Sequence, residues 1–151
     1  TENIKVGIMP AFLFLGILIM KQPNWTFKLP ETIRAAMSRP FSWGEFDCCI
    51  FASECIDAQC GFSPIKPYLN HYKTKAEAFN LIKSKFGSLE KAVSRYFKSI
   101  EIEHVQRGDL VLFKGEDGDS LAVVWAGHYW GVTPEGVKPV QINPIKAWRV
   151  E

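Results

Sequence analysis

The chain has 151 residues, of which 47% are hydrophobic and 13% aromatic, and it carries a formal net charge of +2. This size suits one domain with a single hydrophobic core. The lysines and arginines are scattered, so the sequence lacks the basic cluster that is typical of nucleic-acid-binding proteins. We therefore expect no nucleic acid among its partners.

The first region is an apolar run over residues 6–20, in which no side chain is charged or strongly polar. It is shorter than the ~20 residues that a membrane-spanning helix needs. A secretory signal has an apolar part of this length, but no Ala-x-Ala cleavage pattern follows here. We predict an N-terminal arm over residues 1–22 and a single domain over residues 23–151. Three interpretations of the arm stay open: docking on a partner protein, membrane association, and an internal core element.

The next helix is predicted to begin at Pro30, since proline is accepted in the first turn of a helix. Its apolar face would be short and would end before Pro40. Residues 43–52 then read Trp-Gly-Glu-Phe-Asp-Cys-Cys-Ile-Phe-Ala, a loop that leads into a second helix. Asp47 suits the N-cap, because its carboxylate can accept hydrogen bonds from the free amides of the first turn. This second helix is predicted over residues 48–59, and its buried face would contain Phe51, Ala52 and Cys55.

Cys48 is the candidate nucleophile, because a thiol on the first turn lies near the positive end of the helix dipole, which favours the thiolate. The alternative is a cysteine that only packs, which is common for free thiols. Cys49 points to a different side of the helix, Cys55 is expected in the core, and Cys60 is left unassigned. No Cys-x-x-Cys pair or neighbouring histidine accompanies them, so we predict no metal site, no cofactor and a reducing compartment.

The remaining elements separate into helices followed by strands. Residues 62–73 contain two prolines and predict an irregular connection. Thr74 and Ser88 are suited to cap two further helices, over residues 74–86 and 88–97. From residue 100 apolar and polar residues alternate or form short apolar runs, which predicts strands. The predicted strands cover residues 100–103, 110–113, 121–126, 129–132, 137–142 and 147–150. This order predicts an α+β fold.

Several motifs of the sequence resemble the NlpC-type members of the papain-like fold. Asp47-Cys48 at the head of a helix and residues 107–113 (Arg-Gly-Asp-Leu-Val-Leu-Phe) carry this resemblance. Residues 39–44 (Arg-Pro-Phe-Ser-Trp-Gly) and 147–150 (Ala-Trp-Arg-Val) are similar to a group of such proteins encoded in phage and prophage tail-gene clusters. The resemblance implies that the cysteine helix packs on a C-terminal antiparallel sheet or half-barrel, with Cys48 in the place of the nucleophile.

The sequence departs from this family at the general base. The family's histidine opens the strand that follows the Gly-Asp strand, and Ser120 occupies that place here. A serine hydroxyl cannot accept the thiol proton near neutral pH as imidazole does. His128 is the remaining candidate base beside Cys48 and Asp47, but it lies at the far end of the strand, and His104 is the next candidate.

Three functions follow from these observations, and the third is a membrane-attached host-cell protein anchored by residues 6–20. The first is a structural or assembly component of a phage or prophage tail with lost or weakened hydrolase activity, located in the virion or the bacterial host cytoplasm. Its arm would contact other virion or tail proteins, with membrane contact through residues 6–20 as an alternative. The second is an active cysteine peptidase or amidase that acts on cell-wall peptides through a Cys48 thioester.

Overall fold

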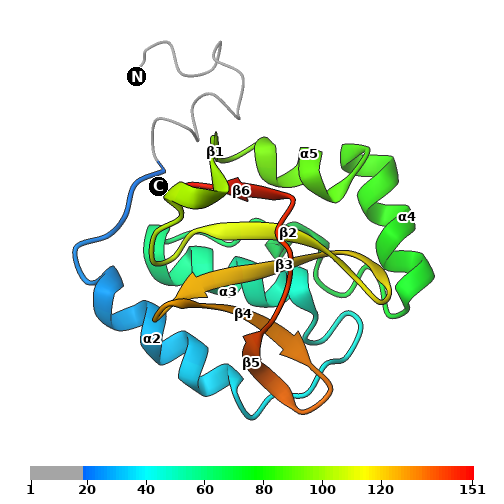
Figure 1. Ribbon diagram of the computed structural model, residues 1–151. Coiled ribbons are helices and arrows are strands. Elements are labelled where there is room, and N and C mark those ends of the chain that lie inside the picture. The colour runs from blue at the N-terminus through cyan, green and yellow to red at the C-terminus, as the bar shows by residue number, and fades with distance from the viewer. Residues whose placement is uncertain (1–18) are drawn as a thin grey trace.

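The computed structural model describes residues 19–151 (Figure 1). Most of the predicted arm lies outside these residues, and Ile19, Lys21 and Gln22 at its end contact the domain. Ile19 is buried in the core, and the backbone N–H of Gln22 donates to the carbonyl of Gln59 at 2.7 Å. The helices are α2 (Trp25–Ala36), α3 (Cys48–Cys60), α4 (Lys75–Phe86) and α5 (Leu89–Ser94), with 3₁₀ turns at Lys66–Tyr68 and Ile102–His104.

A single antiparallel sheet follows the helices in the order β1-β6-β2-β3-β4-β5. The strands are β1 (Ser99–Ile100), β2 (Leu110–Gly115), β3 (Gly118–Trp125), β4 (His128–Thr133), β5 (Gly136–Val140) and β6 (Lys146–Trp148). Helix α3 packs against β3 and β4, and α2 packs beside α3 (Figure 1). The prediction of an α+β fold with a cysteine helix packed on an antiparallel sheet is confirmed at this level.

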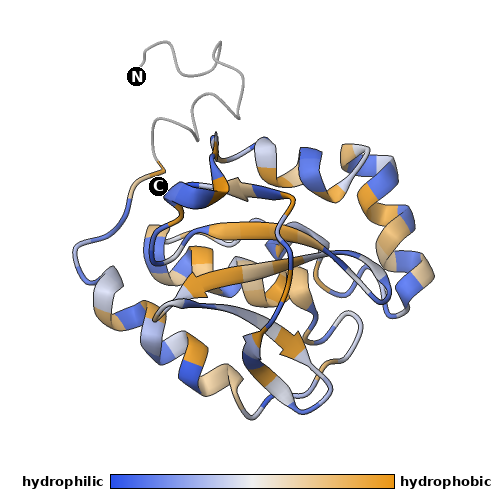
Figure 2. Cartoon of the chain, in the orientation of Figure 1, coloured by the Kyte–Doolittle hydropathy of each residue, from blue (hydrophilic) through white to orange (hydrophobic). Residues whose placement is uncertain are grey.

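The core lies on both faces of the sheet. On the α3 side, Phe51 and Cys55 of the helix are fully buried with Leu110 and Val123 of the strands. On the other side, the connection from β5 to β6 crosses the sheet and packs Ile142 onto a smaller apolar cluster (Figure 1). Strands β2 and β3 are buried on both faces, and Figure 2 shows hydrophobic residues concentrated along them.

Several predicted boundaries are wrong, including those of one helix and two strands. The helix expected at Pro30 begins earlier, at Trp25, because full burial of Leu29 outweighs the local preference of proline for a first turn. The strand expected over residues 100–103 ends at Ile100, since the chain turns there into a 3₁₀ helix. The strand expected to reach residue 142 ends at Val140, where the crossing segment begins.

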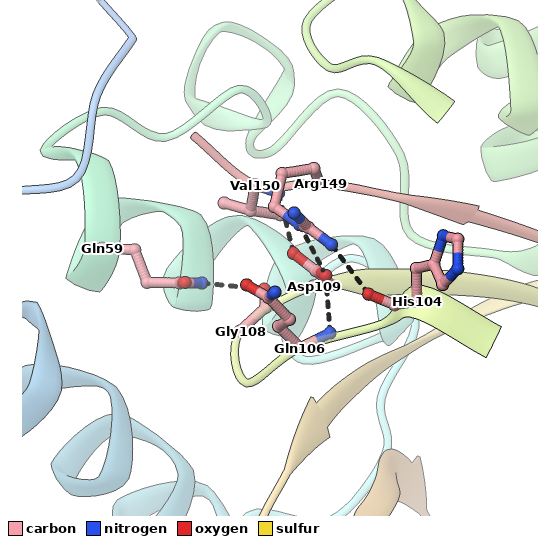
Figure 3. A network of polar contacts seen from close by, with 7 residues as sticks. All are labelled: Gln59, His104, Gln106, Gly108, Asp109, Arg149 and Val150. Carbon is pink, nitrogen blue, oxygen red and sulfur yellow. Dashed lines mark hydrogen bonds and ion pairs between the residues drawn. The ribbon is translucent and has the colours of Figure 1, made fainter. Parts of the chain in front are cut away.

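A buried polar network joins the turn before β2 to the C-terminal end of the chain (Figure 3). Asp109 is 0% exposed, and its carboxylate accepts hydrogen bonds from the N–H of Gln106 at 2.8 Å and the N–H of Val150 at 3.1 Å. Arg149 forms an ion pair with it, with Nε at 3.0 Å from Oδ2. Two motifs that are forty residues apart, around Asp109 and Arg149, therefore form one structural unit.

The same unit is attached to α3. Nε2 of Gln59, a fully buried residue, donates to the carbonyl of Gly108 at 3.0 Å (Figure 3). Gly108 has φ +94°, and a Cβ at this position would collide with the Gln59 side chain. Only glycine fits this close approach without strain. The network thus fixes how β2 lies relative to the C-terminal end of the cysteine helix.

Candidate functional site

The N-terminus of α3 is organised by Asp47. This residue is 2% exposed and caps the helix, since Oδ1 accepts from the N–H of Cys49 at 3.1 Å and of Ile50 at 3.0 Å. Its second oxygen, Oδ2, accepts from the N–H of Gly44 at 3.1 Å and from the hydroxyl of Tyr72 at 2.6 Å. The predicted N-cap is confirmed, and the carboxylate is fully engaged in holding the loop, the helix and a distant tyrosine together.

Tyr72 is a part of this site that the sequence did not reveal. It comes from the irregular connection between α3 and α4, and its phenol is buried beside Asp47. Burial raises the pKa of Tyr72 well above its ordinary value, and the hydrogen bond to Asp47 acts in the same direction. The hydroxyl therefore stays protonated and serves as a donor. Gly44 has φ +80°, and a Cβ there would collide with the carbonyl of Tyr72, so the two loops meet without room for a side chain.

The Cys48 thiol lies beside Cys49, Ser120 and the backbone of Leu121. A hydrogen bond with the Cys49 thiol lowers the pKa of Cys48 below its ordinary value, and hydrogen bonds with the Ser120 hydroxyl and the Leu121 backbone add to this effect. Burial and the negative charge of Asp47 oppose the shift. The net direction favours the thiolate, which is the nucleophilic form of cysteine.

The other three cysteines are shifted the opposite way. The hydrogen bond to Cys48 and burial raise the pKa of Cys49. Burial raises the pKa of Cys55, and it raises that of Cys60 to about 11. Of the four cysteines, Cys48 is the one whose pKa is lowered, and the main cause is its hydrogen bond with Cys49. Its role as a nucleophile stays a prediction.

A cleft of about 980 Å³ opens in front of Cys48. Its walls come from α4, from the β2–β3 and β4–β5 hairpins and from the segment between β5 and β6. Aromatic rings form much of one side, where Trp43 lies 4.8 Å from Phe41 and 6.1 Å from Phe79 between ring centroids. This volume is at the upper end of the range for small-molecule sites.

The structure does not bring a histidine to the thiol. All three histidines lie within residues 19–151, all are exposed, and none lines the cleft. His128 begins β4 and pairs with Trp125, which is about 17 Å along β3 from Ser120 at ~3.3 Å per residue. The strand carries the chain away from Cys48 and does not bend back. His104 is the last residue of a 3₁₀ helix, and its backbone carbonyl accepts a hydrogen bond from Arg149 of the Asp109 network.

A model of the family described as a domain of unknown function, DUF6950, matches residues 20–150. The chain belongs to the DUF6950 family. A comparison with curated proteins found no match. The region matched to DUF6950 includes α3, the cleft in front of Cys48 and the Asp109 network.

Two further properties describe this DUF6950 domain. Within residues 19–151, no three His, Cys, Asp or Glu side chains gather closely enough to hold a metal ion. Over the same residues, every helix is too short or too polar to cross a membrane.

Proposed function

We propose that this chain is an NlpC-type, papain-like protein of a phage or prophage tail, in which hydrolase activity has been lost or weakened. One observation carries the proposal: the group opposite the Cys48 thiol is the hydroxyl of Ser120, while every imidazole lies outside the cleft. The cysteine helix, its aspartate cap and its packing on β3 support the papain-like part of the proposal.

The chemistry of peptide hydrolysis explains why Ser120 matters. A cysteine hydrolase needs a base that takes the thiol proton and later activates water against the thioester. Ser120 can donate a hydrogen bond to a thiolate, but it accepts no proton near neutral pH. Positioned general acid–base groups contribute about 100- to 10,000-fold to rate, so their absence leaves little turnover of a stable amide.

The tail assignment rests on the resemblance of residues 39–44 and 147–150 to tail-cluster proteins. Arg149 and Val150 of the second of these motifs belong to the Asp109 network. The apolar run over residues 6–20 lies almost entirely outside the described residues, and it supplies a segment of the kind that docks on a neighbouring subunit.

An active cysteine peptidase or amidase is the second candidate. The lowered pKa of Cys48 favours it, because an activated thiol is the first requirement of such an enzyme. The cleft would then hold a cell-wall peptide. The two candidates differ in one measurable property, which is turnover of peptide bonds by the natural chain.

A hydrolysis assay on cell-wall peptides separates these candidates. We expect the natural chain to release no more product than Cys48→Ala. Ser120→His, which restores an imidazole opposite the thiol, should raise hydrolysis about 100-fold or more. Turnover by the natural chain that Cys48→Ala abolishes would overturn the proposed loss of activity.

The assembly role has its own test. Purified tail particles should contain the chain at a fixed ratio to the other tail proteins, and deleting its gene should leave the tails incomplete. A Cys48→Ala variant should restore complete tails, because the proposed role needs the folded domain and not the thiol. Complete tails formed in the absence of the chain would contradict this role.

A further inference from the structure

Cys48 combines three properties that the proposed function does not use together. The pKa of its thiol is lowered, the thiol lies in a large cleft with aromatic and aliphatic walls, and no histidine lines that cleft. We propose that Cys48 is an acyl-acceptor site, which takes an apolar acyl group from an activated thioester and retains it. This inference rests on the proposed loss of the general base.

The site has the elements that selective modification requires. Cys49, Cys55 and Cys60 are all held as neutral thiols, so they compete poorly for an electrophile at neutral pH. Cys48 and Cys49 are both partly buried and both line the cleft, so a donor can approach from that side, and the raised pKa of Cys49 leaves Cys48 as the more reactive of the two. Acylation of the folded chain is therefore expected at one position.

The transfer needs no base beyond the thiolate itself. The Cys48 sulfur attacks the carbonyl carbon of the donor thioester, a new carbon–sulfur bond forms, and the donor's carbon–sulfur bond breaks. The donor leaves as a thiolate and takes a proton from solvent, so one thioester replaces another without any change in oxidation state. An amide donor would instead require protonation of a poor leaving group, which the site cannot supply.

Retention follows from the same deficiency. Hydrolysis of the acyl-cysteine requires a water molecule activated by a base. The Ser120 hydroxyl and the Cys49 thiol surround the sulfur as hydrogen-bonding groups, and neither is a base near neutral pH. We therefore expect acylation of Cys48 to proceed and hydrolysis of the acyl-cysteine to be slow.

The walls of the cleft indicate the class of acyl group. Phe79 and Ile82 of α4 face the cleft together with Phe113 of β2 and Val140 of β5. The acidic side chains at its rim are neutralised in part, since Asp117 pairs with Lys75. A straight aliphatic acyl chain would bury its methylenes against these walls, and burial of apolar surface is favourable.

Intact-mass measurement tests this site with octanoyl-N-acetylcysteamine as the probe. The full chain at neutral pH should gain one octanoyl group, and peptide mapping should place it on Cys48. The adduct should persist after the donor is removed. Cys48→Ser should gain none, and the urea-unfolded chain should be acylated on all four cysteines, which shows that the fold provides the selectivity.

The length of the acyl chain tests the cleft. Acylation by the octanoyl probe should be roughly tenfold or more faster than by the acetyl analogue, since burial of even two methylenes is worth about this factor. Phe79→Ala, which shortens the apolar wall without adding a charge, should reduce the ratio of the octanoyl rate to the acetyl rate. Iodoacetamide labelling of Cys48 confirms that each variant keeps a folded, reactive site.

Each remaining outcome has a defined meaning. If iodoacetamide labels Cys48 but the octanoyl probe gives no adduct and is not consumed, the acyl-acceptor inference is wrong and the proposed function is untouched. If the natural chain consumes the probe catalytically without accumulating an adduct, a base is present and both are wrong. Ser120→His should convert retention into turnover, and an adduct of equal lifetime in that variant would overturn the explanation of retention.

Discussion

Two buried aspartates organise this molecule at opposite ends of α3, and they are held in different ways. Asp109, at 0% exposure, has a cationic partner in Arg149 and lies within the interior of the domain. Among residues 19–151 no cation bonds to Asp47, which is 2% exposed and accepts hydrogen bonds from three backbone N–H groups and the Tyr72 hydroxyl. Asp109 contacts the C-terminal segment of the chain through Arg149 and Val150, whereas Asp47 lines the open cleft.

The difference separates a structural centre from a chemical one. A buried carboxylate beside an arginine is neutralised as a pair, and this suits a joint between chain segments. The Asp47 carboxylate is bound by amides and a hydroxyl, and its charge raises the pKa of the neighbouring Cys48 thiol. Changes at Asp109 should therefore alter stability, and changes near Asp47 should alter both stability and thiol reactivity.

The largest expected effect comes from breaking the Asp109 pair. Arg149→Met removes the cation, the hydrogen bond to the His104 carbonyl and the neutralisation of a fully buried carboxylate. Removing one partner of a buried ion pair destabilises a protein by about 3–5 kcal/mol. Urea unfolding should show a loss near the lower end of that range, because Arg149 is partly exposed.

Lys146→Ala is the matched control for this prediction. Lys146 also lies in the C-terminal segment and pairs with Glu90, but both side chains of that pair reach solvent. Exposed pairs contribute about 0–1 kcal/mol, so this variant should unfold close to the natural chain. Equal losses in the two variants would show that the Asp109 network is no more important than a surface ion pair.

The second effect distinguishes the cap from the charge of Asp47. Asp47→Ala should lower the free energy of unfolding by about 2 kcal/mol, because it removes an N-cap and leaves the Tyr72 hydroxyl without its partner. Asp47→Asn retains a capping oxygen and should lose less. Since the charge of Asp47 raises the pKa of Cys48, Asp47→Asn should also shift iodoacetamide labelling of Cys48 to lower pH. A shift to higher pH would contradict the electrostatic account.

Local sequence signals predicted much of the fold, because the decisive residues act on their own neighbours. Asp47 caps the helix that it immediately precedes, and Gly61 ends that helix with φ +80°. The change to strand periodicity near residue 100 gave the α+β class. Pro30 misled the prediction, because burial of Leu29 depends on packing between distant segments and not on local preference.

The sequence predicted only those residues of the site that lie next to each other in one motif. Cys48 and Asp47 are adjacent, so the activated thiol and its cap could be proposed together. Tyr72 reaches Asp47 across twenty-five positions through an irregular loop, and no spacing rule links them. The position of Ser120 followed from the resemblance alone, and its contact with the thiol depends on how β3 lies against α3.

The smallest expected change in the free energy of unfolding comes from substitutions beside the Cys48 thiol, and these should change its pKa. Cys49→Ala and Ser120→Ala should each alter the free energy of unfolding by about 1 kcal/mol or less, since both side chains are partly exposed. Both should raise the pKa of Cys48, and Cys49→Ala should raise it more, because the bond to Cys49 is the largest stabilising contact of the thiolate. The labelling rate of Cys48, followed against pH, measures this order. If Ser120→Ala has the larger effect, the hydroxyl opposite the thiol and not the neighbouring cysteine sets its reactivity.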